Sequence, residues 1–262
     1  MTHKLVNYSV QDGIAILELN DPPANTYSHE MMRELDDGIL AARFDDAVQV
    51  IVLRGSGDRF FCAGANIKLL TTVTPRYKYA FCLHANETLN RLESTPKLVI
   101  AALNGHTVGG GLEVALACDL RIARRGAGKI GLPEVNLGVL PGTGGTQRLA
   151  RLLGKSKAIE LICSGRTFAF EEAHALGLVN HVYESAAFME QVLDYARGFT
   201  TPHMAAHAIG LVKRAVQSGV EMSFDGGLAL ERELQQQLFE SDDAREGLSA
   251  YVEKRQARFQ GR

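Results

Sequence analysis

Short apolar runs of β type alternate along the chain with segments of helical period, which restricts the fold to the α/β class. Residues 48–55 and 98–103 are apolar enough for buried strands, and residues 77–92 between them have the spacing of a helix. Residues 5–20 alternate apolar and polar side chains around Asp12-Gly13, which predicts a β-hairpin. A buried α/β core therefore begins close to the N-terminus.

Helical segments connect and follow these strands. Ser28 is expected to cap a helix whose apolar side chains share one face. The segments "DLRIA" and "KIGLP" indicate two more short strands, and after Thr146 only "LVNHVY" does. We therefore expect a core of repeated ββα units over residues 1–200. Residues 201–262 form a C-terminal helical region of the same domain, amphipathic enough to pack on a neighbouring subunit.

Charge and cysteine content exclude several classes of protein. Lys plus Arg (28) nearly balances Asp plus Glu (30), and no basic run follows the pattern of a phosphate-backbone site, so nucleic acid is not expected as the main partner. The four cysteines are too widely spaced for a CxxC pair or a zinc finger, so no metal site is predicted. No apolar run approaches the ~20 residues of a membrane span. We expect a soluble, cytoplasmic protein with reduced thiols.

Several familiar motifs are incomplete. "LGKS" lacks the first glycine of a phosphate-binding loop, because that position is Leu149, and no serine lies in G-x-S-x-G. His203 and His207 are four apart on a predicted helix without an intervening glutamate, so we interpret them as surface or boundary histidines. Cys62 is interpreted as a buried spacer rather than a nucleophile, since no signature places a histidine beside it.

Two carboxylates in apolar surroundings are the candidates for acid–base chemistry. Glu113 follows the triplet Gly109 to Gly111 in the first turn of a predicted helix, where favourable interaction with the helix dipole is an alternative explanation. Glu134 follows Pro133 in "KIGLPEVNLG", and a solvated loop acid is the alternative there. Burial and mutual repulsion push the proton affinities of two such acids apart, as acid–base chemistry on one substrate requires.

Two glycine-bearing turns offer backbone N–H groups to a ligand. The triplet before Glu113 and the loop "CAGANIK" both leave the main chain free of bulky side chains. Two N–H groups that converge on one oxygen make an oxyanion hole, in which each donor is worth about 3 kcal/mol.

The segments "FFCAGANIK", "IAALNGHTVGGGLEVALACD" and "LPEVNLGVLPGTGGTQRL", in this order, resemble the enoyl-CoA hydratase/isomerase (crotonase) family. The resemblance extends from "PPANTYS" to the tail "DDAREGLSAYVEKRQARF". It implies a crotonase fold, an acyl-CoA thioester substrate and assembly into trimers or hexamers. It implies no cofactor, because coenzyme A is part of the substrate.

The resemblance also implies residue roles. The oxyanion donors fall on Ala65 and Gly110, and the two glutamates of the hydratases fall on Glu113 and Glu134. These glutamates hold a water that adds at C3 of a trans-2-enoyl thioester. Glu113 is expected chiefly to activate the water and Glu134 to handle the proton at C2. The residues matching coenzyme A contacts are Ala65, Asn66, Ile67, Lys68, Tyr251 and Lys254.

Departures and alternatives remain. Asn66 stands where the family most often has Asp. An enoyl-CoA hydratase is the leading hypothesis; the alternatives are a hydratase of branched or carboxylated enoyl-CoA and a double-bond isomerase, which needs one acid. A more remote alternative is an RNA-binding relative. That would need a lysine-rich helix, whereas residues 28–42 contain Arg33 as their only Lys or Arg.

Overall fold

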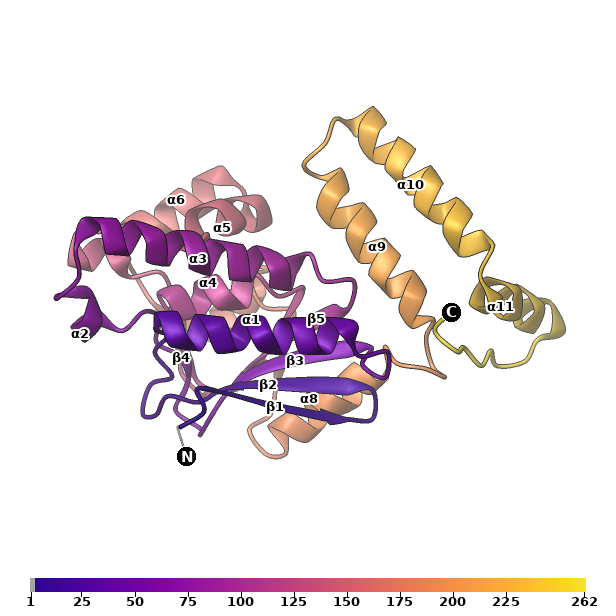
Figure 1. Ribbon diagram of the computed structural model, residues 1–262, viewed down its shortest axis with the longest axis horizontal. Helices are drawn as coiled ribbons and strands as arrows, with labels where there is room; N and C mark the ends of the chain where they lie inside the picture. Colours follow the sequence, from indigo (N-terminus) through magenta and orange to yellow (C-terminus); the bar gives the residue numbers. More distant parts are fainter. Residues whose placement is uncertain (1–2) are drawn as a thin grey trace.

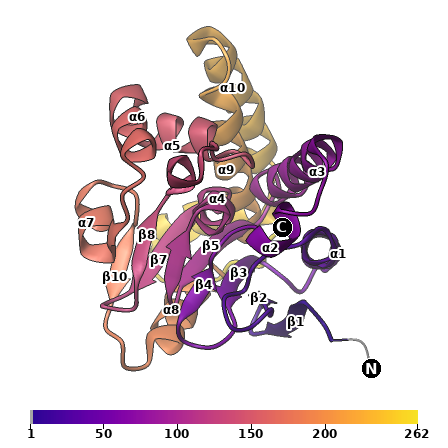
Figure 2. The same ribbon diagram turned by 90° about the vertical axis from the view of Figure 1, so that its left-hand side faces the viewer.

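The computed structural model describes residues 3–262, which fold around a six-stranded and a four-stranded sheet (Figures 1 and 2). The large sheet has the order β1-β2-β3-β5-β7-β10 and the small sheet the order β4-β6-β8-β9. The strands of the large sheet are β1 (Val6–Gln11), β2 (Ile14–Leu19), β3 (Val50–Gly55), β5 (Leu98–Leu103), β7 (Leu120–Arg124) and β10 (His181–Tyr183). Those of the small sheet are β4 (Phe60–Cys62), β6 (His106–Val108), β8 (Lys129–Gly131) and β9 (Phe168–Ala169).

Helices cover both sheets and form the C-terminal region. The helices of the core are α1 (His29–Phe44), α2 (Ile67–Leu70), α3 (Pro75–Glu93), α4 (Gly110–Leu116), the 3₁₀ turn η1 (Glu134–Leu137), α5 (Gly145–Leu153), α6 (Lys155–Ser164), α7 (Phe170–Ala175) and α8 (Phe188–Arg197). The C-terminal helices are α9 (Ala206–Gly219), α10 (Phe224–Phe239) and α11 (Asp242–Glu253). No helix within residues 3–262 combines the length and apolar character needed to span a bilayer.

Repeated ββα units account for the two sheets. In the successive pairs β3–β4, β5–β6 and β7–β8, the first strand enters the large sheet and the second enters the small one. The pairs are followed in turn by α3, α4 and α5, with the short α2 and η1 in between. The repeat expected from the sequence is therefore confirmed. Because β4, β6 and β8 run parallel, the repeat brings the segments that follow them to one end of the small sheet.

The predicted N-terminal elements are also confirmed. β1 and β2 pair antiparallel from Val6↔Leu19 to Gln11↔Ile14. Asp12 (φ 51°) and Gly13 (φ 76°) both adopt left-handed conformations, as a two-residue hairpin turn requires. The Ser28 side chain accepts a hydrogen bond from the Met31 N–H at 3.3 Å and so caps α1.

The large sheet separates two hydrophobic clusters because successive side chains of a strand point to opposite faces. Ile51 and Leu53 of β3 pack in the cluster that includes the buried face of α1. Val50 and Val52, which alternate with them, pack against Phe188 of α8 on the other face. Figure 1 shows α1 and α8 on opposite sides of the sheet.

The C-terminal helices extend away from the sheets, with α9 and α10 antiparallel and α11 at the far end (Figure 1). Lys213 of α9 forms a buried ion pair with Asp119, Nζ to Oδ2 2.8 Å, and donates to the Lys97 carbonyl at 3.0 Å. The C-terminal region is thus anchored to the core at the connection between α4 and β7.

The small sheet was only partly anticipated from the sequence. Its strands β4, β6 and β9 contain only two or three residues, too few for an alternating pattern to show. The expectation of one strand after Thr146 was therefore wrong, since β9 precedes β10. The helix expected to carry both His203 and His207 begins only at Ala206, so His203 lies in the preceding turn.

Candidate active site

The glycine triplet at the start of α4 lies where three parts of the chain converge. Gly109 has φ +58°, a left-handed conformation that favours glycine. A Cβ at Gly110 would overlap the Tyr27 ring, and a Cβ at Gly111 would overlap the Cys62 carbonyl. The last two glycines therefore allow close packing of the protein on itself, in addition to any room they leave for a ligand.

The loop after β4 reaches the same place. Gly64 has φ +86°, and a Cβ built on it would lie 2.8 Å from the Gly110 nitrogen. Tyr27 pairs with the residues flanking Ala65, donating from its N–H to the Gly64 carbonyl at 3.0 Å and accepting from the Asn66 N–H at 3.2 Å. Within residues 3–262, the N–H groups of Ala65 and Gly110 donate no backbone hydrogen bond. The structure thus brings together the two predicted donors.

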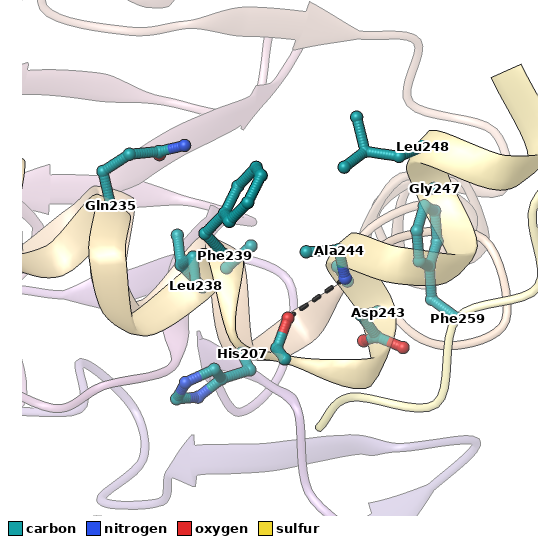
Figure 3. A pocket seen from close by; sticks show the side chains of 12 residues that line it. His207, Gln235, Leu238, Phe239, Asp243, Ala244, Gly247, Leu248 and Phe259 are labelled. Carbon is teal, nitrogen blue, oxygen red and sulfur yellow. Dashed lines mark hydrogen bonds between the residues drawn. The ribbon is translucent and has the colours of Figure 1, made fainter. Parts of the chain in front are cut away.

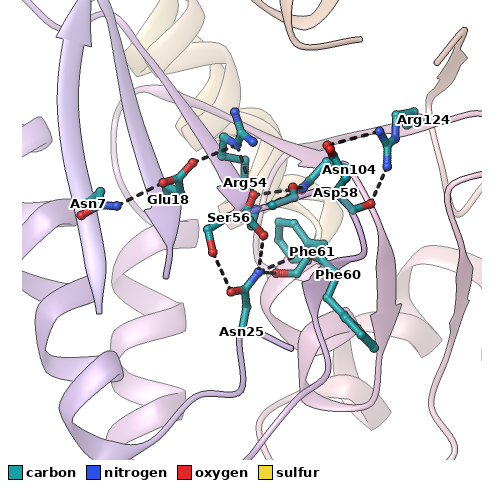
Figure 4. Close-up of polar contacts among 12 residues, drawn as sticks. Asn7, Glu18, Asn25, Arg54, Ser56, Asp58, Phe60, Phe61, Asn104 and Arg124 are labelled. Atoms are coloured by element: carbon teal, nitrogen blue, oxygen red, sulfur yellow. Dashed lines mark hydrogen bonds and ion pairs between the residues drawn. The ribbon is translucent and has the colours of Figure 1, made fainter. Parts of the chain in front are cut away.

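An amide network holds the connection between β3 and β4, which leads into the site (Figure 4). The Asn25 side chain donates to the Ser56 carbonyl at 3.0 Å and to the Phe60 carbonyl at 2.9 Å. The Asn104 side chain donates to the Gly55 carbonyl at 2.9 Å. Because these bonds join the connection between β3 and β4 to neighbouring loops, they set the position from which β4 enters the site.

Glu113 is 2% exposed, and its carboxylate accepts three hydrogen bonds from one turn. Oε1 accepts from the N–H groups of Thr143 (2.8 Å) and Gly145 (2.7 Å), and Oε2 accepts from the Thr143 hydroxyl. Since that hydroxyl proton goes to Glu113, Tyr27 is the donor in its 3.1 Å hydrogen bond to Thr143 Oγ1. Burial and the Glu113 carboxylate raise the pKa of Tyr27 well above its ordinary value, so the phenol keeps the proton it donates.

Glu134 begins η1, directly after β8 and Pro133. A Cβ at Gly109 would lie 3.1 Å from Glu134 Oε1, so this carboxyl group is beside the start of α4. Its Oε2 is buried and has no hydrogen-bond partner among residues 3–262. Burial, and to a smaller extent the Glu113 carboxylate, raises the pKa of Glu134 to about 7. Its own backbone N–H and Lys78 act in the opposite direction.

The two carboxyl groups therefore differ in hydrogen bonding although they lie in one site. Glu113 is held by three donors, which fix its orientation. Glu134 has one oxygen without a partner in residues 3–262, and its proton affinity suits exchange near neutral pH. The solvated-loop explanation for Glu134 is wrong for its carboxyl group. The apolar residues after it are nevertheless exposed, Leu137 at 61% and Leu140 at 67%.

The residues matched to coenzyme A contacts fall into two separate places. Asn66 caps α2, with Oδ1 accepting from the Leu69 N–H at 3.2 Å, so the amide performs the capping that an aspartate would also perform. Ile67 and Lys68 on α2 are exposed. Tyr251 is 86% exposed on α11 and Lys254 follows it as the helix C-cap. Figure 1 shows α2 and α11 at opposite ends of the molecule, so one chain does not bring the two groups together.

The other candidates have structural roles. Cys62 is fully buried, and burial raises the pKa of its thiol to about 12, which leaves no thiolate for a nucleophile at neutral pH. Within residues 3–262, no three His, Cys, Asp or Glu side chains are grouped as metal ligands.

Tyr27, Thr143 and Lys78 are the site residues that sequence reasoning missed. Thr143 lies in the segment "PGTGGTQ", where nothing in the sequence distinguishes it from the other small residues. No sequence pattern indicates that this turn would hold the carboxylate of Glu113, which lies 30 residues earlier in the chain. Lys78 was visible only as one cation in a helical segment.

The sequence and the fold of the chain are similar to those of known proteins. Residues 9–262 match the family described as enoyl-CoA hydratase/isomerase. The crotonyl-CoA hydratase of Syntrophomonas wolfei is 34% identical over 260 residues, 99% of each chain. The mitochondrial methylglutaconyl-CoA hydratase of Mus musculus is 37% identical over 254 residues, which cover 95% of this chain and 80% of the relative. A crystal structure of an enoyl-CoA hydratase from Geobacillus kaustophilus HTA426 is 45% identical with a TM-score of 0.96, covering 100% of this chain and 98% of that one. The chain, with its two sheets of ββα units and C-terminal helices, therefore belongs to the enoyl-CoA hydratase/isomerase (crotonase) family and has the crotonase fold.

Proposed function

We propose that the protein is an enoyl-CoA hydratase, which adds water across the 2,3 double bond of a trans-2-enoyl-CoA to give a 3-hydroxyacyl-CoA. The observation that carries this proposal is the pair of carboxyl groups, Glu113 and Glu134, at the start of α4. Hydration needs both a base and an acid, whereas a double-bond isomerase needs only one such group. Incubation with enoyl-CoA thioesters of different chain length tests the proposal. Formation of the 3-hydroxyacyl thioester supports it, and double-bond migration without hydration contradicts it.

The oxyanion hole would act on the thioester carbonyl. The N–H groups of Ala65 and Gly110 belong to two turns that lie against each other, and they have no backbone acceptor within residues 3–262. Addition of water at C3 moves negative charge onto the thioester oxygen as an enolate forms. Hydrogen bonds to that oxygen strengthen as the charge develops, so they lower the barrier rather than merely binding the substrate.

The two carboxyl groups would then divide the proton transfers. Glu113, fixed by Thr143 and Gly145, accepts a proton from the water as its oxygen bonds to C3. Protonated Glu134 gives its proton to C2 through Oε2, which has no hydrogen-bond partner among the residues that the structure describes. The pair carries one proton before and after the reaction, but the proton is on Glu134 at the start and on Glu113 at the end. Transfer of a proton from Glu113 back to Glu134 restores the starting state. Because the two acids are coupled, the titration belongs to the pair.

The pKa of Glu134 predicts a pH dependence. Only the singly protonated pair is active, and the raised pKa of about 7 describes loss of its last proton. We expect kcat/KM to fall about tenfold per pH unit well above pH 7. The reverse reaction uses the same number of protons, so dehydration should fall in parallel. Measurement in both directions from pH 6 to 9 tests this, and a flat profile would contradict a protonated Glu134.

Lys68 and Lys254 are proposed to contact the nucleotide end of coenzyme A, Lys254 from a neighbouring subunit, together with Ala65, Asn66, Ile67 and Tyr251. Both lysines are exposed, which suits electrostatic attraction to phosphates. We expect Lys68→Ala and Lys254→Ala to raise the Kd for coenzyme A several-fold while turnover at saturating thioester changes little. Calorimetric titration checks this, and an unaltered affinity removes the residue from the site.

Assembly into trimers or hexamers is proposed for the C-terminal region, residues 201–262. Its helices expose large apolar side chains, including Val212, Val216, Phe224, Phe239 and Val252. A cavity of about 350 Å³ between α9, α10 and α11 is lined by apolar Leu238, Phe239, Leu248 and Phe259 (Figure 3). Apolar area of this kind is typical of a surface that another subunit covers. Sedimentation equilibrium distinguishes a monomer from these assemblies.

The alternative substrates are the branched or carboxylated enoyl-CoA thioesters considered in the sequence analysis. The mouse relative is named for methylglutaconyl-CoA, a branched and carboxylated enoyl thioester, and the bacterial relative for crotonyl-CoA. An RNA-binding role would need a basic surface, which the composition of α1 does not provide.

A further inference from the structure

Lys78 of α3 is a half-buried cation without a counter-ion in the described part of the chain. Its ammonium lies 5.3 Å from the centre of the Phe81 ring, a cation–π contact. Within residues 3–262 it forms no ion pair and its ammonium donates no hydrogen bond. Arg91 of α3 pairs with Asp36, and Arg148 pairs with Glu93. Arg76 of α3 forms no ion pair within residues 3–262 either, but it is exposed to solvent. Lys78 therefore combines an unmatched charge with partial burial.

The helix itself does not account for this charge. Lys78 is the fourth residue of α3, whose first turn contains no acidic side chain. A cation near a helix N-terminus is placed unfavourably in the field of the peptide dipoles. Its position is better explained by something outside the helix.

Aromatic contacts connect Lys78 to the carboxyl pair. Phe81 is buried and its ring stacks on Tyr27, with centroids 5.8 Å apart and planes inclined by 21°. Tyr27 in turn bonds to Thr143, which holds Glu113. The positive charge of Lys78 also acts on Glu134, whose pKa it lowers. The ammonium therefore lies on the α3 side of the carboxyl pair, beside the stacked rings of Phe81 and Tyr27.

A purely hydrocarbon acyl chain would fit this border poorly. It would remove water from the ammonium and offer no hydrogen-bond acceptor in exchange, which is unfavourable for a charge. A carboxylate would supply the missing counter-ion and accept a charge-assisted hydrogen bond. Glu134 is assigned to C2 of the acyl group, and the charge of Lys78 acts on Glu134. We therefore assign the group that meets Lys78 to the acyl part of the substrate.

We propose that Lys78 binds a carboxylate at the far end of the acyl chain, so that the substrate class is a trans-2-enoyl-CoA bearing a terminal carboxylate. The assignment rests on the proposed hydratase function for its orientation of the thioester. Coenzyme A phosphates are the other anions that a substrate brings, and they are common to every thioester. The carboxylate is therefore tested by comparing acyl groups on the same carrier.

Crotonyl-CoA and glutaconyl-CoA differ by one terminal carboxylate and make the kinetic comparison direct. The quantity measured is the ratio of their kcat/KM values for hydration. We expect Lys78→Met to lower kcat/KM for glutaconyl-CoA about 10- to 100-fold relative to crotonyl-CoA, the range expected for a charged hydrogen bond. Lys78→Arg, which keeps the charge, should preserve most of the preference. The matched control is Lys155→Met at the exposed start of α6, which should leave the ratio unchanged.

A binding measurement makes the result independent of hydration. Titration of glutaryl-CoA and butyryl-CoA, the saturated counterparts, gives two Kd values for each variant. We expect Lys78→Met to weaken glutaryl-CoA binding about 10- to 100-fold more than butyryl-CoA binding. If Lys78→Met selectively weakens glutaryl-CoA binding but the parent protein hydrates no enoyl-CoA, the hydratase function is contradicted and the carboxylate site is supported.

The opposing outcomes are equally clear. Equal loss for both acyl groups would assign Lys78 to a coenzyme A phosphate or to the proton affinity of Glu134, and would overturn the carboxylate site. An unchanged ratio in both the kinetic and the binding comparison would also overturn it. Circular dichroism of each variant establishes that the fold is retained before either comparison is made.

Discussion

Replacing either carboxyl group by its amide, as Glu113→Gln or Glu134→Gln, is expected to lower kcat for hydration of a trans-2-enoyl-CoA about 10²- to 10⁴-fold. Glutamine keeps the size of the side chain but neither accepts nor gives a proton in the required step. The Thr143 and Gly145 N–H groups can still donate to an amide oxygen at position 113, so the turn should retain its place. The loss should therefore fall on the chemical step.

Two measurements isolate that step. Disappearance of the thioester-conjugated double bond gives kcat, and titration with a saturated acyl-CoA gives binding, which should change by less than about threefold because the oxyanion N–H groups remain. Glu190→Gln on the exposed surface of α8 is the matched control and should retain full activity. Near-normal turnover in either site variant would exclude that residue from proton transfer.

Replacing Lys213 by methionine is expected to lower the free energy of unfolding by about 3–5 kcal/mol. Lys213 and Asp119 are almost completely buried, with side-chain exposures of 5% and 11%. Asp119 also accepts from the Val99 N–H at 2.7 Å and from Gln217 Nε2 at 2.9 Å. Methionine preserves the length of the side chain but leaves the carboxylate buried without its cation.

Urea unfolding of the variants at one fixed protein concentration measures this effect. Asp119→Asn in the Lys213→Met background removes the uncompensated charge, so the double variant should be more stable than the sum of the two single losses implies. The exposed Lys155→Met should stay within about 0.5 kcal/mol of the parent protein. If Lys213→Met behaves like this surface control, the buried pair does not anchor α9.

The local elements were predictable because their signals lie within a few residues. Asp12-Gly13 supplies left-handed turn residues, and Ser28 supplies a cap three residues before its donor. The sequences of β4 and β6 gave no such signal. A strand of three residues is stabilised by hydrogen bonds to strands of other ββα units, as β4 is by β6. The parallel pairing of the small sheet brings those neighbours together only after the chain has folded.

The residues of the candidate site could be proposed from the sequence, whereas their hydrogen bonds and proton affinities could not. Glu113, Glu134, Ala65 and Gly110 were recognised from motifs, and the structure brings the donors and the acids to the start of α4. The hydrogen bonds that hold Glu113 come from residues 30 and 32 positions later, and the neighbouring Tyr27 is 116 positions before its partner Thr143. No local pattern encodes contacts of that separation.

The sequence by itself determined the α/β class and the helix and turn signals, because these depend on side-chain type and on short-range spacing. It also supplied Glu113 and Glu134 as the candidate acids. Only the tertiary structure decided that Glu134 has a pKa of about 7, that Glu113 is fixed by three donors and that the Lys78 ammonium lies over the Phe81 ring without an ion-pair partner among residues 3–262. Burial and electrostatic fields depend on distances through space, and folding sets those distances among residues that lie far apart along the chain.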